Sequence, residues 1–149
     1  MRLFSIVGFI AAAGCATQTS DPFTSDTQTV VMARRGGFAP TPAAGSTCAP
    51  MDETYTLVVA TGQLSWQVCT SATLGGVYKF QPGSATPSAS ALSSLEESLH
   101  GLGAPAGPCA ADIADKIVFH TTTGDTTITS AQCIPGEMAV FTVIHTIAP

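Results

Sequence analysis

Two cysteine pairs bracket two hairpin-like segments, and this arrangement limits the fold more than any other feature. Between Cys109 and Cys133, β-branched residues flank the turn sequence Thr121-Thr122-Thr123-Gly124-Asp125, in which Gly tolerates a positive φ and Asp can cap the local backbone. Between Cys48 and Cys69, two strand-like runs again flank a Thr-Gly turn. Four cysteines allow three pairings. We favour Cys48–Cys69 and Cys109–Cys133, because each pair brackets one hairpin and would contribute about 3 kcal/mol.

Two further segments have features of helices. Ser93 and Glu96 form a capping box, and an apolar stripe follows at helical spacing in Leu95, Leu99 and Leu102. The segment 135–148 is rich in Val, Thr and Ile, which favours a strand, but its apolar residues also follow a 3.6-residue period. We expect a helix there, with a strand as the alternative.

Short strands are expected at 29–33 and 77–80, and the Pro-, Gly- and Ser-rich segment 81–90 is typical of a linker. Trp66 alternates with polar residues in a strand-like run, so we expect it to anchor the sheet to the core, with an exposed binding platform as the alternative. The predicted class is α+β: a small antiparallel sheet of two cysteine-stapled hairpins plus short strands, covered by one or two helices.

Residues 1–14 have the form of a secretory signal peptide. Arg2 precedes the apolar run 3–13, which is shorter than the roughly 20 residues that a membrane-spanning helix needs. The polar segment 15–29 follows neither hydrophobic period and is predicted to be a lipidated N-terminus and tether. This leaves 30–149 as a single small domain.

The sequence Ala12-Ala13-Gly14-Cys15 resembles the lipobox of bacterial lipoproteins. The resemblance implies cleavage before Cys15, attachment of a lipid to that cysteine, and a membrane as partner. Ala16 after the cysteine implies sorting to the outer membrane, with the domain facing the periplasm or the cell surface. An ordinary signal peptide that contains a cysteine is the alternative. If Cys15 carries lipid, four cysteines remain, an even number that suits disulfides in an oxidising compartment.

Charge and motif content exclude several function classes. The chain has 5 basic and 10 acidic residues, so we do not expect nucleic acid as a partner. The cysteines lack C-x-x-C spacing and the three histidines are scattered, so we expect no metal site. The sequence contains no nucleophile elbow, P-loop or dinucleotide-binding motif, so we expect neither an enzyme nor a cofactor.

The stretch Arg34, Arg35, Gly36, Gly37 and Phe38 is the predicted binding site. Two cations, a flexible Gly-Gly and an aromatic residue are the ingredients of a contact loop. A solvated turn, with a bulge at the glycines and Phe38 in the core, is the alternative.

A short motif links this stretch to a family. Gly36-Gly37-Phe38-Ala39, preceded by Arg34 and a strand, is similar to the opening motif of the emfourin-type small inhibitors of thermolysin-like metalloproteases. The resemblance implies an α+β fold and a protease as partner. The predicted function is therefore a lipid-anchored protein-binding module, in its most specific form a protease inhibitor. The alternative is a structural envelope lipoprotein that acts as a spacer without a dedicated ligand.

Overall fold

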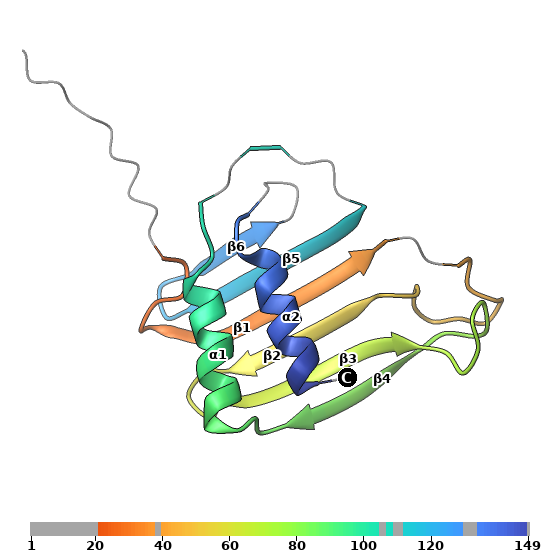
Figure 1. Cartoon of the computed structure of the whole chain (residues 1–149), viewed down its shortest axis with the longest axis horizontal. Helices are drawn as coiled ribbons and strands as arrows, with labels where there is room; N and C mark the ends of the chain where they lie inside the picture. Colours follow the sequence, from red (N-terminus) through yellow and green to blue (C-terminus); the bar gives the residue numbers. More distant parts are fainter. Residues whose placement is uncertain (1–20, 38–39, 105–106, 109–111, 130–133, 149) are drawn as a thin grey trace, which may run out of the picture.

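The computed structural model describes residues 21–37, 40–104, 107–108, 112–129 and 134–148 of the chain. Its elements are β1 (Thr27–Gly36), β2 (Glu53–Val58), β3 (Gln63–Thr70), β4 (Lys79–Ala85), α1 (Ala89–His100), β5 (Ile113–Thr121), β6 (Asp125–Thr129) and α2 (Glu137–Ile147). Both helices lie on one face of the sheet, so the described residues form two layers (Figure 1).

The strands form an antiparallel sheet in the order β4-β3-β2-β1-β5-β6. Strand β1 lies between the two predicted hairpins, β2–β3 and β5–β6, and pairs with the first strand of each. The α+β class is confirmed. The sheet is larger than expected, because β1 joins the hairpins into one layer of six strands.

Strand β1 begins before the predicted domain boundary at residue 30. Thr27 is its first residue, and Phe23, which precedes it, is only 6% exposed. Removing an aromatic side chain from water is worth roughly 2 kcal/mol, which holds this segment on the domain. Residues 21–29 therefore belong to the folded domain and not to a tether. The predicted signal peptide and Cys15 lie outside the described residues.

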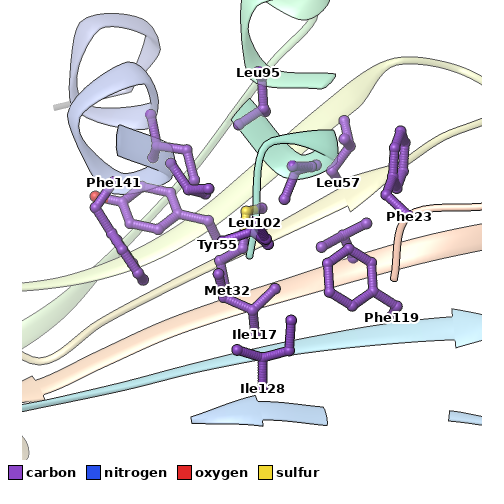
Figure 2. Close-up of a cluster of buried hydrophobic side chains, with 14 of the residues drawn as sticks. Phe23, Met32, Tyr55, Leu57, Leu95, Leu102, Ile117, Phe119, Ile128 and Phe141 are labelled. Carbon is purple, nitrogen blue, oxygen red and sulfur yellow. The ribbon is translucent and has the colours of Figure 1, made fainter. Parts of the chain in front are cut away.

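The core lies between the sheet and the two helices, where alternate strand residues meet the buried faces of α1 and α2 (Figure 2). The largest fully buried side chains are Tyr55, Phe119, Phe141, Met32, Leu57, Leu64, Leu95, Leu99, Ile117, Ile144, Val30 and Val140. On β1 the period of two places Val30, Met32 and Arg34 on the core side. An arginine thus follows two apolar residues on the buried face.

Strand β4 continues through Pro82 and Gly83, so the predicted linker 81–90 is wrong over its first half. Proline is tolerated here because β4 is at an edge of the sheet. Trp66 lies opposite Gly83 and packs against the core, as predicted, and a Cβ atom on Gly83 would overlap its indole ring.

Helix α1 begins at Ala89, four residues before the predicted start at Ser93. Ser88 is its N-cap, and its Oγ atom accepts a hydrogen bond from the backbone N–H of Ala91 at 3.3 Å. The predicted apolar stripe is confirmed, since Leu95 and Leu99 are fully buried. Helix α2 confirms the helix expected at 135–148.

One of the two predicted disulfides is confirmed. Cys48 and Cys69 are bonded, with their Cα atoms 6.0 Å apart. Cys109 and Cys133 lie outside the described residues, so their pairing stays a prediction. Within the described part of the chain, no helix is both long enough and apolar enough to span a membrane.

Candidate functional site

Arg34 lies at the centre of a group of charged residues under α2. The strand register places it opposite Glu53 on β2 and Asp115 on β5. Its Nε and Nη2 atoms each donate to one carboxylate oxygen of Asp115 at 2.8 Å, and its Nε atom lies 3.9 Å from Oε1 of Glu53. Only 8% of Arg34 is exposed. The two-point ion pair therefore replaces the hydration that the guanidinium loses on burial.

Helix α2 covers this ion pair with three residues from its first turns. The guanidinium carbon of Arg34 lies 4.0 Å from the centroid of the Phe141 ring, which is a cation–π contact. Met138 places its sulfur 3.8 Å from Nη2. Glu137, the first residue of α2, lies close enough to Asp115 and Arg34 to interact electrostatically with both. Arg34 is thus enclosed between two strands and a helix.

Glu53 connects the ion pair to the other end of α2. Its carboxylate accepts a hydrogen bond from the Tyr55 hydroxyl at 3.1 Å and lies 2.9 Å from Nε2 of His145. These contacts complete a set that we call the polar cluster: Arg34, Glu53, Tyr55, Asp115, Glu137 and His145. Among the described residues, no buried side-chain nitrogen or oxygen lacks a hydrogen-bond partner.

The polar cluster holds more acidic than basic groups, and this imbalance shifts its titration. Burial, followed by the hydrogen bond to Asp115 and its charge, raises the pKa of Glu137 to about 7, although Arg34 acts in the opposite direction. Burial, and then the charge of Glu53, raises the pKa of Tyr55. The hydrogen bond to Asp115 outweighs burial and raises the pKa of Arg34, so its charge is fixed.

The cluster is built to hold α2 on the sheet. Its polar groups are engaged with one another, and it contains no serine, cysteine or lysine nucleophile. Strongly perturbed groups often mark functional sites, but structural ion-pair networks perturb pKa values as well. Within the described residues, no group of three or more His, Cys, Asp or Glu side chains is arranged to hold a metal ion.

The predicted contact stretch 34–38 is divided by the structure. Arg34 is buried and cannot serve as an exposed contact residue, because its guanidinium is held by Asp115. Arg35 points to the opposite face of the sheet and is exposed. Phe38 lies outside the described residues.

The two glycines of this stretch end β1 beside β5. Gly36 has φ 85°, and a Cβ atom on it would lie 2.8 Å from the carbonyl oxygen of Asp112. The N–H of Gly37 donates to that same oxygen at 2.8 Å. Glycine is needed at Gly36 because neither its backbone angle nor this close approach suits a side chain.

Two long loops, 43–52 and 70–80, are fastened to each other. Cys48, in the loop before β2, is bonded to Cys69 of β3. Thr47 N–H donates to the Tyr78 carbonyl at 2.9 Å, and Tyr78 N–H donates to Ser46 Oγ at 3.0 Å. We call this region, residues 35–37, 43–52 and 70–80, the stapled loop end; its two long loops lie side by side on the right in Figure 1.

The stapled loop end exposes four large apolar side chains. Leu74 is 88% exposed, Val77 45%, Met51 44% and Phe80 38%. Met51 lies over Gly37, because a Cβ atom there would come within 3.0 Å of its sulfur. Of the described residues, Val58 and Met138 are the other large apolar residues that are exposed. Exposed large apolar side chains on loops that are fastened together are candidates for a protein-contact surface.

No strong sequence pattern marks this surface. Leu74 and Val77 flank Gly75-Gly76, an arrangement in which apolar residues sit in a glycine-rich loop, and this was the one available hint. They lie in a loop that hydrogen bonds and the disulfide fasten to the loop containing Met51. The predicted stretch therefore contains Arg35, Gly36 and Gly37 and none of these apolar residues.

Two shallow hollows lie apart from the polar cluster. One, of about 360 Å³, lies over β2, β3 and β4 and is lined by Thr54, Thr56, Ser65, Trp66, Gln67, Pro82 and Gly83. The other, of about 560 Å³, is lined by residues 25–29 and 58–60 together with Thr122. Neither hollow contains a member of the polar cluster, so neither presents a substrate to it.

No family model matches the sequence, and no curated protein or solved structure is detectably similar to it.

Proposed function

We propose that the chain is a lipid-anchored envelope protein that binds a protein partner through the stapled loop end. The observation that carries the proposal is the group of exposed apolar residues on loops fastened by a disulfide and by hydrogen bonds. A surface that is rigid before binding loses little conformational entropy when it binds. Met, Phe and Arg are also enriched at protein interfaces. Arg35 supplies an exposed cation two residues before Gly37, the glycine that Met51 covers.

We propose a thermolysin-like metalloprotease as the partner. The support is the similarity of Gly36-Gly37-Phe38-Ala39 and Arg34 to the emfourin-type motif, together with the place of Gly37 beneath Met51. The proposed activity is binding and not catalysis, because the polar groups beneath α2 are engaged with one another. If the stapled loop end binds no protein, the alternative function, a spacer lipoprotein without a dedicated ligand, is favoured.

Inhibition of thermolysin by the full-length chain tests the partner. We expect wild-type protein to inhibit, and the triple variant Arg35→Ala, Leu74→Ser, Val77→Ser to have an inhibition constant at least about tenfold weaker, since the central residues of an interface each contribute about 1–2 kcal/mol. The melting temperature should stay near that of wild type, because these side chains are exposed.

Val58→Thr is the matched control, since it removes an exposed apolar side chain outside the stapled loop end. It should inhibit like wild type. Equal inhibition by the triple variant and wild type would exclude the stapled loop end as the contact surface. If wild type does not inhibit thermolysin, the protease partner is excluded. Capture from a secreted-protein extract, compared between wild type and the triple variant, then decides between another partner and a spacer.

The membrane anchor is a separate part of the proposal and depends on Cys15. We expect the mature wild-type protein to partition into detergent and to carry lipid on Cys15, whereas Cys15→Ala should be released or left uncut. Intact-mass and N-terminal peptide analysis measure both. An unmodified N-terminus at Ala16 or beyond would exclude lipidation without affecting the binding proposal.

A further inference from the structure

We propose that the N-terminal arm, residues 21–26, fixes the orientation of the anchored domain, with the end of the sheet where β1 begins facing the membrane and the stapled loop end facing away. We call the membrane-facing end the tether end; it comprises residues 21–27 and the turns 59–62 and 121–125. This orientation rests on the lipid anchor at Cys15 proposed above, and it adds the surface of the domain that lies next to the lipid headgroups.

The arm is attached to both layers of the fold. Phe23 is buried, and the centroid of its ring lies 4.8 Å from that of His100 at the end of α1 and 6.2 Å from that of Phe119 on β5. A carboxylate oxygen of Asp21 contacts Nδ1 of the same histidine. The other oxygen of Asp21 accepts a hydrogen bond from the backbone N–H of Phe23 at 2.9 Å. The chain is therefore held on the domain from Asp21 onward.

A hydrogen-bonded turn joins the arm to β1. The backbone N–H of Thr27 donates to the Thr24 carbonyl at 3.0 Å, and the backbone N–H of Thr24 donates to Oγ1 of Thr27 at 3.1 Å. The hydroxyl of Thr122 donates to Oδ2 of Asp26 at 3.4 Å, which links the arm to the turn between β5 and β6. The position of Asp21 is thus fixed relative to the sheet.

The docked arm leaves only a short connection to the lipid. Cys15 and Asp21 are six positions apart, and an extended chain spans at most about 3.5 Å per residue, so the two residues are separated by at most about 20 Å. A tether that reached residue 29, as predicted from the sequence, would allow about 50 Å. Burial of Phe23 therefore shortens the distance over which the domain can move away from the bilayer.

Strand β1 separates the tether end from the stapled loop end. It has 10 residues, which corresponds to about 30 Å at about 3.3 Å per residue. The register pairs its beginning with Val58 and Thr121, whereas Met51 of the stapled loop end lies over Gly37, just beyond its last residue. The beginning of β1 and the two long loops lie on opposite sides of Figure 1. Because the tether is shorter than β1, the domain cannot invert and place the stapled loop end on the bilayer.

The charge of the domain favours an upright position over one on its side. The chain has 5 basic and 10 acidic residues, so anionic lipid headgroups repel it. A domain on its side would bring the whole length of the sheet near the headgroups, whereas an upright domain brings only the tether end there. The upright position also leaves the stapled loop end accessible to a soluble protein.

Paramagnetic relaxation in the NMR spectrum of the lipidated full-length chain tests this orientation. The protein is placed in nanodiscs of phosphatidylethanolamine and phosphatidylglycerol that contain a lipid with a gadolinium chelate on its headgroup. We compare the amides of Gly62 and Gly124 at the tether end with those of Gly45 and Gly75 at the stapled loop end. The enhancement should be at least about tenfold larger at the tether end, because it falls with the sixth power of distance and the two ends are about 30 Å apart.

Two variants test the role of the arm. Phe23→Ser removes the ring that holds the arm, and a Gly-Ser insertion after Ser20 lengthens the tether without altering the domain. In both, the ratio of the enhancements at the two ends should fall towards one. Met138→Ser, which replaces an exposed apolar residue on α2, is the matched control for Phe23→Ser and should keep the wild-type ratio.

Equal enhancement at the two ends in wild type would overturn the orientation, and so would a larger enhancement at the stapled loop end. A wild-type ratio in the insertion variant and in Phe23→Ser would show that the arm does not set it. If intact-mass analysis finds no lipid on Cys15, the anchor is excluded and the orientation with it. Lipidated protein with equal enhancement at both ends would exclude the orientation alone.

Discussion

Replacing Asp115 with alanine should lower the free energy of unfolding by about 3 kcal/mol, the lower end of the range for breaking a buried ion pair. The cost arises because the guanidinium of Arg34 stays buried, at 8% exposure, without its two-point partner. We choose the lower end because Glu53 lies 3.9 Å from Nε of Arg34 and would remain as a weaker partner. Urea denaturation of the full-length chain measures the change.

A double-mutant cycle separates the ion pair from simple packing. Arg34→Met alone should also destabilise the protein, because it leaves Asp115, Glu53 and Glu137 without the cation that they surround. The double variant Arg34→Met, Asp115→Leu should cost much less than the sum of the single changes, since apolar residues of similar size often replace a buried ion pair at little cost. Additive effects would contradict a direct coupling.

Lys116→Ala is the control for this cycle, because Lys116 neighbours Asp115 on β5 but is exposed on the opposite face. We expect its free energy of unfolding to stay within about 0.5 kcal/mol of wild type. A loss below about 1 kcal/mol for Asp115→Ala would show that Arg34 finds enough solvent or another partner, and the structural role of the polar cluster would be wrong.

The hairpins, the α+β class and α2 could be predicted because their signals are local. Alternation of polar and apolar residues, turn residues and a 3.6-residue period all act within one segment. The start of α1 was missed because two serines compete as N-cap. The capping box at Ser93 is the stronger pattern in sequence, but Ser88 follows Pro87 and is the residue that caps the helix.

The interior role of Arg34 could not be predicted, although the period of two on β1 placed it on the same face as Val30 and Met32. A charged residue is expected at the surface unless a partner is known. Its partner Asp115 is 81 positions away in the sequence and meets it only through the pairing of β1 with β5. The continuation of strand β4 was missed for the same reason, because the need for glycine at Gly83 arises from the Trp66 indole ring on the neighbouring strand and is not visible in the local sequence.

The stapled loop end also depends on contacts between residues that are far apart in the sequence, so only part of it could be predicted. Arg35 and Gly37 were identified because they are adjacent in sequence to a recognisable motif. Leu74 and Val77 lie in a loop that backbone hydrogen bonds and one disulfide fasten to the loop of Met51, and Met51 in turn lies over Gly37. The Cys48–Cys69 pair was predicted from its hairpin, but the surface that it organises belongs to loops outside that hairpin.

Removing this disulfide should be the second large effect. The double variant Cys48→Ala, Cys69→Ala should lose about 3 kcal/mol of unfolding free energy, as estimated from the unfolded-chain entropy released when a link across 21 positions is cut. Both cysteines are replaced so that no free thiol is left to exchange with another cysteine. Denaturant unfolding gives the change, and non-reducing peptide mapping of wild type should recover Cys48 linked to Cys69.

The loss of stability should be accompanied by local loosening. The stapled loop end keeps its hydrogen bonds from Thr47 and Tyr78, but these bonds are worth only about 1 kcal/mol each, so its amides should exchange faster in the double variant. Amides of β5 serve as the internal reference, because β5 pairs with β1 and β6, far from the disulfide in the strand order. Equal acceleration at both places would mean that the disulfide stabilises the whole domain without rigidifying this surface. Faster exchange confined to the loops, together with weaker inhibition of thermolysin, would instead tie the proposed binding activity to the rigidity of the stapled loop end.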